Sequence, residues 1–282
     1  MSEMCEGNNI SKHVCIIGDA HGQLPKIQTL LRDAQLIDST DRWVGKSASV
    51  WFLGDFCDRG PDGIGVIDLV MRLQHEASAV GGAVHALLGN HDVLILAVHR
   101  FSSRRGNEPG GVFIKDWQRN GGIQSDLDRL STEHIHWLNH LPAMALVQER
   151  LLIHADSDFY MQFGQSIDTV NANMQFILHN SDASQWNYLL DLFAGRKVFD
   201  RRHADGAALA TRLLRTFGGR QIIHGHTPIN YMNGMAPEQI TEAFVYQGGR
   251  CVNADGGMYL GGPGFVHRLG SLDPKLSLLR RQ

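Results

Sequence analysis

Cysteine and long apolar runs are both scarce in this chain. Its 282 residues include four cysteines, and no two of them form a Cys-x-x-Cys pair. A chain of this length can bury a sizeable core without disulfides, so we expect free thiols in a reducing, cytoplasmic compartment. No apolar run reaches the length of a membrane span, and Met1 to Lys12 lacks the apolar centre of a signal peptide. These absences argue against a membrane partner.

An excess of positive charge is also missing. The chain carries 26 lysines and arginines against 29 acidic residues, which gives a formal net charge of −3. Because binding to a nucleic-acid backbone requires a basic surface, we expect no nucleic-acid partner. Hydrophobic residues make up 43% of the chain and charged residues 20%, as in ordinary globular proteins. We expect one domain over residues 12–282, preceded by a mobile tail over residues 1–11.

One pattern occurs three times in the first third of the chain: an apolar, strand-like run ends in glycine followed by aspartate or asparagine. The runs lead into Gly18-Asp19-Ala20-His21-Gly22, Gly54-Asp55-Phe56-Cys57-Asp58-Arg59-Gly60 and Gly89-Asn90-His91-Asp92. Asp19, Asp55 and Asn90 lie 36 and 35 residues apart, which leaves room for a strand, a crossover helix and the next strand. Parallel strands would bring the three loops to one sheet edge, where open α/β sheets bind ligands.

The remaining periodicity predicts a mixture of helices and a second sheet. Helical patterns cover residues 24–36, 63–79, 113–141, 159–193 and 205–217, whereas 144–155, 221–223 and 250–255 have the character of strands. Residues 276–280 are expected to add an edge strand, and the polar stretch 102–111 to form a loop that borders the substrate. Parallel strands in the first half and mixed strands in the second predict two facing sheets with helices outside.

The three glycine-containing blocks resemble the signature motifs of the calcineurin-like metallophosphoesterases. More narrowly, Gly-Asp-x-His-Gly, Gly-Asp-x-x-Asp-Arg-Gly and Gly-Asn-His-Asp are similar to those of the PPP-type phosphoprotein phosphatases and their bacterial relatives. The segment 36–45 resembles the Shewanella-like phosphatases, and the run from Trp117 to Pro142 also resembles diadenosine tetraphosphate hydrolases. The resemblance covers roughly residues 12 to 260. It implies an α/β fold, a four-layer α/β/β/α sandwich of two mixed sheets flanked by helices, with a dinuclear metal site at the sheet edges.

The resemblance also implies two divalent metal ions per chain. One ion would be bound by Asp19, His21 and Asp55, and the other by Asp55, Asn90, His154 and His226, so that Asp55 bridges both. Oxygen and imidazole ligands suit manganese, iron or zinc, and manganese is expected here. His224 competes with His226, but Gly-His-Thr-Pro is the motif that matches.

Roles in the reaction follow from the same resemblance. A metal-bridging hydroxide would attack phosphorus directly, and His91 would act as the general acid that protonates the leaving oxygen. Asp58 would orient His91, while Arg59 and Asn90 would hold phosphate oxygens. A second phosphate-binding arginine is expected at Arg201, with Arg196 and Arg202 as alternatives that remain open.

These residues predict a metal-dependent phosphomonoesterase that acts on phosphorylated protein or peptide, with phosphoserine and phosphothreonine favoured. A dinucleoside polyphosphate hydrolase is the first alternative, because it would share every metal ligand. A catalytically silent binding module is a second, and the intact pair of Asp58 and His91 argues against it. Two departures from the family pattern stand out. Asp92 occupies a position that is usually glutamate, and His154-Ala155-Asp156 replaces a glycine-bearing triplet.

Overall fold

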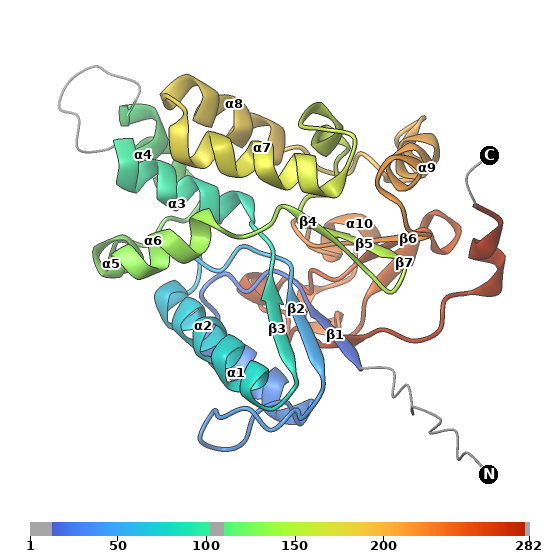
Figure 1. The fold of residues 1–282 in the computed structure, drawn as a ribbon, viewed down its shortest axis with the longest axis horizontal. Helices are drawn as coiled ribbons and strands as arrows, with labels where there is room; N and C mark the ends of the chain where they lie inside the picture. The colour runs from blue at the N-terminus through green and yellow to red at the C-terminus, as the bar shows by residue number, and fades with distance from the viewer. Residues whose placement is uncertain (1–12, 102–109, 280–282) are drawn as a thin grey trace, which may run out of the picture.

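The computed structural model describes residues 13–101 and 110–279 (Figure 1). The predicted tail over residues 1–11 and residues 102–109 of the predicted substrate loop lie outside this range. Gly110 and Gly111, which were included in that loop, instead begin helix α4 (Gly110–Arg119).

The first sheet contains the three strands that lead into the glycine-containing blocks. Its order is β3 (Ala83–Ala86), β2 (Ser49–Phe52), β1 (Val14–Ile17) and β9 (His267–Arg268). β1 pairs with β2 and β2 with β3 in parallel, while β9 runs antiparallel to β1. Helices α1 (Leu24–Asp33) and α2 (Gly63–Ala79) make the crossovers, as the residue spacing predicts. The carboxyl ends of β1, β2 and β3 therefore meet at one edge.

The second sheet comes from the later half of the chain. Its order is β4 (Met144–Val147), β5 (Arg150–Ile153), β6 (Gln221–His224), β8 (Cys251–Asn253) and β7 (Phe244–Tyr246). The three central strands β5, β6 and β8 are parallel, and the outer strands β4 and β7 are antiparallel to their neighbours. Both sheets are thus mixed, as predicted.

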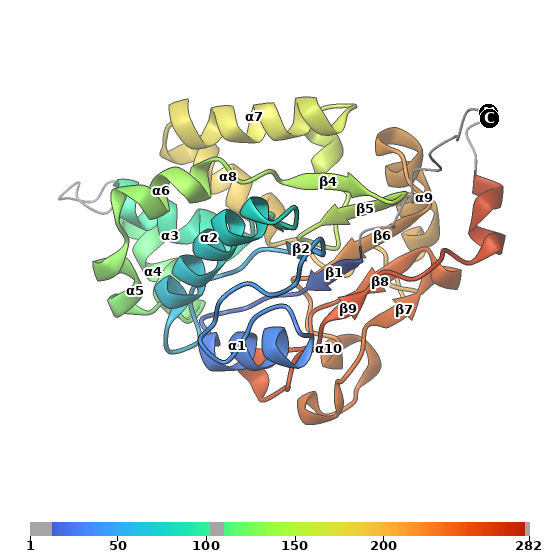
Figure 2. The ribbon, with the colours of Figure 1, turned by 60° about the horizontal axis from the view of Figure 1, so that its bottom comes forward.

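Helices cover the outer faces of the two sheets. Figure 2 shows α1 below the first sheet and α7 (Ile167–Asn180) above the second. The remaining helices are α3 (Asn90–Phe101), α5 (Gln124–Arg129), α6 (Thr132–Asn139), α8 (Ala183–Phe193), α9 (Gly206–Phe217) and α10 (Asn230–Asn233). This is the predicted four-layer α/β/β/α sandwich. None of the helices in the described ranges is long and apolar enough to cross a membrane.

The central strand β1 is covered on both faces, which explains why it is apolar throughout. All four residues of β1 are buried. Val14 and Ile16 pack between the sheets, with Leu152 and Ile223 of the second sheet in the same cluster. Cys15 and Ile17 belong to the cluster that includes Ile27 and Leu31 of α1. A strand buried on both sides has a continuous apolar run rather than alternating apolar and polar residues.

The predicted edge strand over residues 276–280 is wrong. Pro274–Leu279 instead forms a 3₁₀ helix. Proline is favoured in a first helical turn, and Asp273 accepts hydrogen bonds from the backbone N–H groups of Lys275 and Leu276, which closes a turn. The edge strand next to β1 is β9, which comprises only two residues.

Candidate metal centre

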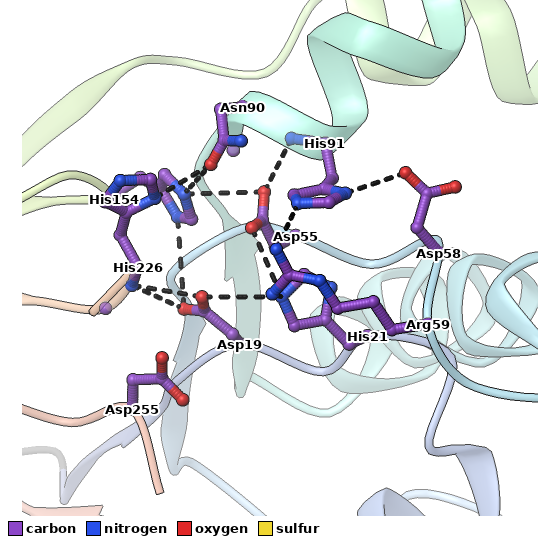
Figure 3. A network of polar contacts seen from close by, with 12 residues as sticks. Asp19, His21, Asp55, Asp58, Arg59, Asn90, His91, His154, His226 and Asp255 are labelled. Atoms are coloured by element: carbon purple, nitrogen blue, oxygen red, sulfur yellow. Dashed lines mark hydrogen bonds and ion pairs between the residues drawn. The ribbon is translucent and has the colours of Figure 1, made fainter. Parts of the chain in front are cut away.

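Loops from both sheets converge on one cluster of polar side chains (Figure 3). Asp19 and Asp55 follow β1 and β2, and Asn90 begins α3 just after β3. From the second sheet, His154 follows β5 and His226 follows β6. The structure therefore brings together all six residues predicted as metal ligands, His21 included, although their positions span more than two hundred residues of sequence.

Two overlapping groups of side chains could each hold a metal ion. His21, Asp55 and His91 form one group, and Asp55, His154 and His226 form the other, with the ligand atoms of each group within 4.8 Å of one another. Asp55 belongs to both, as expected of a bridging ligand. The first group contains His91, which was predicted as a general acid rather than a ligand.

Asp19 and Asn90 complete the cluster. A carboxylate oxygen of Asp19 lies 3.9 Å from Nε2 of His21, and both Asp19 oxygens accept the backbone N–H of His226 at 2.9 and 3.0 Å. Oδ1 of Asn90 lies 3.0 Å from Nε2 of His154 and 2.8 Å from Nδ1 of His226. The carboxylates of Asp55 and Asp19 lie against the backbone at Gly89 and Gly225, respectively. Only glycine leaves room for them, because a Cβ atom at either position would collide with the carboxylate.

Hydrogen-bond chemistry shows that this donor set fits cations. Nδ1 of His154 donates to the carbonyl of Leu53 at 2.8 Å, so its Nε2 presents a lone pair to the Oδ1 of Asn90, which also has only lone pairs. Nδ1 of His21 likewise faces the carbonyl of Cys57, which leaves its Nε2 as a lone pair near Asp55. Nε2 of His226 is buried without any hydrogen-bond partner. The facing lone pairs of His154 Nε2 and Asn90 Oδ1, with no proton between them, are unfavourable unless a cation lies beside them.

Burial also changes the pKa values of the cluster in the sense that favours metal binding. It lowers the pKa of His154, and lowers the pKa of His21 and His226 well below the ordinary histidine value. These imidazoles are therefore neutral, the form that binds metals. Burial and the neighbouring carboxylates of Asp255 and Asp55 raise the pKa of Asp19, which reflects a concentration of negative charge that divalent ions would neutralise.

The backbone at the site is strained. His21, Asp55, Asp58, Arg59 and His226 all have positive φ angles, between 40° and 69°. Residues other than glycine seldom adopt this region, and such strain concentrates at functional sites, where the surrounding structure holds it in place.

A buried dyad of Asp58 and His91 lies next to the metal-ligand groups. Oδ2 of Asp58 accepts Nδ1–H of His91 at 2.7 Å, and both side chains are almost completely buried. The other oxygen of Asp58 accepts Nε1–H of Trp117 at 2.7 Å, which fixes the carboxylate from the opposite side. His91 must therefore carry its proton on Nδ1 and present Nε2 to the site.

Arg59 projects from the same loop as Asp58. Its guanidinium donates to Nε2 of His21 and to Nε2 of His91, each at 2.8 Å, and lies 4.3 Å from the ring centre of Tyr259. Its backbone N–H donates to the carbonyl of Gly121, where a Cβ atom would lie 2.8 Å from Cγ of Arg59. Arg59 thus provides a positive charge in contact with both the first ligand group and the dyad.

A second carboxylate, Asp92, braces the loops that carry the ligands. Its Oδ2 accepts the backbone N–H groups of Asp55 and Gly89 at 2.9 and 2.8 Å, and its Oδ1 accepts that of Phe56 at 2.9 Å. Asp92 therefore ties the loop after β2 to the loop after β3. The sequence singled out Asp92 as a departure from the family pattern but gave no role for it.

Arg201 is the most exposed of the predicted site residues. It is exposed and lines a small pocket with Asp200, Arg202 and Tyr246, among others, and no predicted metal ligand lines this pocket. Arg202 pairs with Asp200. Burial is the main cause of the lowered pKa of His154 and His226, and the charge of Arg196 is a smaller one. Arg196, one of the alternatives that the sequence left open, is exposed like Arg201.

Asp255 is a site residue that the sequence analysis missed. It lies beside Asp19 (Figure 3), is fully buried, and its Oδ2 has no hydrogen-bond partner. Burial, together with the charge of Asp55, raises the pKa of Asp255 to about 7. The position of Asp255 in the sequence could have identified it, because it follows strand β8 and precedes a glycine pair, just as Asp19 follows β1.

Comparisons with known proteins agree with this geometry. A family model described as calcineurin-like phosphoesterase matches residues 12–230. Shewanella-like protein phosphatase 2 of Arabidopsis thaliana is 36% identical over 102 residues, which cover 36% of this chain and 26% of that protein. A symmetrical bis(5'-nucleosyl)-tetraphosphatase of Erwinia tasmaniensis is 30% identical over 148 residues, which cover 52% of this chain and 45% of that protein. The chain thus aligns with less than half of the length of either relative.

Solved structures show the same fold. A cold-active protein-tyrosine phosphatase of a psychrophilic Shewanella species superimposes with a TM-score of 0.68 at 24% identity, over 92% of this chain and 76% of that one. A protein serine/threonine phosphatase from Saccharomyces cerevisiae gives a TM-score of 0.54 at 15% identity, over 94% and 82% of the two chains. The family match over residues 12–230 shows that the chain belongs to the calcineurin-like phosphoesterases.

Proposed function

We propose that the chain hydrolyses phosphomonoesters, and that its substrates are phosphoserine and phosphothreonine side chains of proteins. The observation that carries this proposal is the dyad of Asp58 and His91 beside the ligand cluster. An alkoxide is a poor leaving group, so a monoester of serine or threonine needs a proton donor at the leaving oxygen. A protein that only bound phosphate would need the ligands but not this dyad.

The residues of the cluster have separable roles in the proposal. Two divalent ions, when bound by Asp19, His21, Asp55, Asn90, His154 and His226, would supply Lewis-acid activation of the nucleophile and neutralise charge on the phosphoryl group. Manganese is the ion we propose, with iron and zinc as the alternatives to be tested.

Arg59 and His91, together with the ligand Asn90, bind and protonate the substrate. His91 delivers the proton from Nε2, since its Nδ1 is committed to Asp58. Asp58 holds the imidazole in that orientation and stabilises its protonated form. The guanidinium of Arg59, already next to His91, holds the phosphate oxygens, and the side chain of Asn90 contacts a further oxygen.

A second arginine would complete the phosphate-binding site. Arg201 is the residue predicted from the sequence, and both Arg201 and its alternative Arg196 are exposed. The charge of Arg196 is a smaller cause, after burial, of the lowered pKa of His154 and His226. We propose Arg201 as the second phosphate contact, with Arg196 and Arg202 as the alternatives to be tested.

A dinucleoside polyphosphate hydrolase is the second candidate function. It is favoured by the similarity to the Erwinia tasmaniensis tetraphosphatase, which covers more of this chain than the similarity to the Arabidopsis protein phosphatase does. Both candidate functions use the same ligand cluster and differ in the part of the substrate that is attached to the phosphate. The buried free cysteines among the described residues, Cys15, Cys57 and Cys251, fit a reducing compartment, and we propose the cytoplasm as the location.

A substrate panel distinguishes the two functions. The full chain is loaded with manganese and assayed on phosphoserine, phosphothreonine and phosphotyrosine peptides, diadenosine tetraphosphate and a cyclic nucleotide. We expect the highest kcat/KM on the phosphoserine or phosphothreonine peptide. A kcat/KM for diadenosine tetraphosphate at least tenfold above every peptide would replace the proposed function by the second candidate. Asp55→Asn provides the control for contaminating phosphatases.

A further inference from the structure

The side chain of Tyr259 comes from a short turn that has a glycine at either end. The 3₁₀ turn Met258–Leu260 is flanked by two residues in the left-handed conformation, Gly257 with a φ of 63° and Gly261 with a φ of 108°. Residues other than glycine seldom adopt these angles, because their Cβ atom clashes with the neighbouring backbone. The two glycines therefore set the direction in which the turn presents Tyr259.

Two charged side chains anchor this turn to other parts of the fold. Oδ1 of Asp255 accepts the backbone N–H of Gly257 at 2.9 Å. Nζ of Lys26, in helix α1, donates to the carbonyls of Met258 and Gly262 at 2.7 and 2.8 Å. The turn is thus tied both to the end of strand β8 and to the helix that follows β1, which limits how far its side chains can move.

The ring of Tyr259 contacts two residues of the candidate metal centre. The guanidinium of Arg59 lies over the ring, with Cζ 4.3 Å from the ring centre. The imidazole of His21 meets the ring edge to face, at a centroid distance of 4.9 Å. A guanidinium within about 6 Å of an aromatic ring centre is attracted by the electron density of the ring face. Tyr259 therefore touches the charge that we propose to bind phosphate.

The other contacts of the Arg59 side chain occupy its N–H groups. Nε–H donates to the carbonyl of Asn120 at 3.3 Å, and the two terminal nitrogens donate to Nε2 of His21 and of His91 at 2.8 Å. In the proposed function both imidazoles have other tasks, because His21 would bind a metal ion and His91 would deliver a proton. The contact with Tyr259 is different, because it uses the face of the guanidinium and occupies none of its N–H groups.

We propose that Tyr259 is a positioning residue, which holds the guanidinium of Arg59 against its ring and so aims the N–H groups at the bound phosphate. The inference rests on the proposed function, because it takes Arg59 to bind phosphate oxygens. A carboxylate in place of the ring would also attract the guanidinium, but it would compete with the phosphate for the same donors. An aromatic face avoids this competition.

A double-mutant cycle tests whether Tyr259 acts through Arg59. The probe is inorganic phosphate, whose binding to the manganese-loaded full chain is measured by calorimetry for wild type, Tyr259→Leu, Arg59→Ala and the double variant. We expect Tyr259→Leu to weaken phosphate binding about three- to tenfold, as for the loss of one cation–π contact. In the Arg59→Ala background the same change should alter the Kd by less than about twofold, because residues that act through one another are not additive.

The electron density of the ring provides a signature that packing alone would not give. Tyr259→Phe should bind phosphate within about twofold of wild type, since the phenyl ring keeps the face that holds the guanidinium. Phenylalanines of increasing fluorine content at position 259 withdraw electrons from this face with little change in size, so the Kd for phosphate should rise steadily along the series. In the Arg59→Ala background the Kd should not depend on fluorine content.

Leu260→Ala is the matched control for damage to the turn, because Leu260 lies in the same turn as Tyr259. It should leave the Kd for phosphate within about twofold of wild type, and a loss as large as that of Tyr259→Leu would overturn the proposal. If Tyr259→Leu does not fold, then the fluorinated series carries the test, because it keeps the ring.

Three other results would also overturn the proposal. One is an equal loss of phosphate affinity with and without Arg59, and another is a Kd that does not respond to fluorination. The third is a loss of bound manganese in Tyr259→Leu, which would make the ring a support of His21. Wild-type protein that binds phosphate while Tyr259→Leu binds it equally well would refute this inference alone. Wild-type protein that neither binds phosphate nor hydrolyses monoesters would refute the proposed function first.

Discussion

Replacing His91 by asparagine tests the proposed chemistry most directly, because the effect should depend on the leaving group. Serine and threonine leave as alkoxides and need a proton, whereas nitrophenol leaves as a stabilised anion and scarcely does. For a phosphoserine peptide we expect kcat to fall by about 10²–10⁴, the usual contribution of general acid catalysis. This corresponds to about 3–5 kcal/mol in the barrier. The loss on p-nitrophenyl phosphate should be clearly smaller.

Asp58→Asn should show the same pattern in weaker form, and the structure indicates its size. Asp58 accepts two N–H groups, from His91 and Trp117, with different oxygens, both at 2.7 Å. Asparagine offers only one oxygen, so its NH₂ group must face one of these donors. The charge-assisted bond to His91 is worth about 1.5–3 kcal/mol, which predicts a loss of roughly ten- to a hundredfold in kcat on the peptide.

The assay measures kcat for both substrates at saturating manganese, with metal content determined by elemental analysis. Equal losses on the two substrates would refute the assignment of His91 as general acid. The alternative is that His91 binds a metal ion, because it lies close to His21 and Asp55 in one of the two ligand groups. In that case His91→Asn should also lose one of the two metal ions.

Three further substitutions test the ligands and their supports. Asp55→Asn should abolish activity and most metal binding, because a neutral side chain bridges two cations poorly; two ions per chain by elemental analysis would exclude Asp55 as the bridge. Arg59→Ala should raise KM and lower kcat with metal content unchanged, since the guanidinium stabilises phosphoryl charge in the ground and transition states; an unchanged Ki for inorganic phosphate would contradict this role. Asp92→Ala leaves three buried backbone N–H groups without an acceptor. Each unpaired N–H group should cost about 1 kcal/mol or more of stability, so we expect Tm to fall by roughly 6–12 °C in a thermal melt. A change below about 2 °C would show that these hydrogen bonds contribute little to stability.

The parts of the fold that the sequence predicted correctly, and the grouping of the candidate ligands in space, depend on local signals. Asp19, Asp55 and Asn90 each follow an apolar run directly, and the intervals between them allow only short crossover connections. Parallel strands must then place the three residues at one edge, and the structure shows them there. His154 and His226 could be found in the same way, because each comes just after an apolar strand.

Features that depend on distant partners could not be predicted. Strands β7 and β9 comprise only three and two residues, too few for a pattern, and they form because β8 and β1 offer free edges. The brace by Asp92 and the bond from Trp117 to Asp58 connect residues 36 to 59 positions apart. Nothing in the sequence near Arg201 and Arg196 indicates which of the two would contact a phosphate.

The meeting of the two sheets at the ligand cluster has a consequence for the lifetime of the protein. The backbone N–H of His226 donates to Asp19, 207 residues earlier in the chain, and ions bound between these loops would cross-link the first sheet to the second. Separating the sheets then requires that the ions dissociate, so bound metal should slow unfolding itself and not only shift the equilibrium. We expect the protein to resist proteolysis for longer when loaded than after chelation. Metal supply would therefore set how long each molecule survives as well as how fast it works.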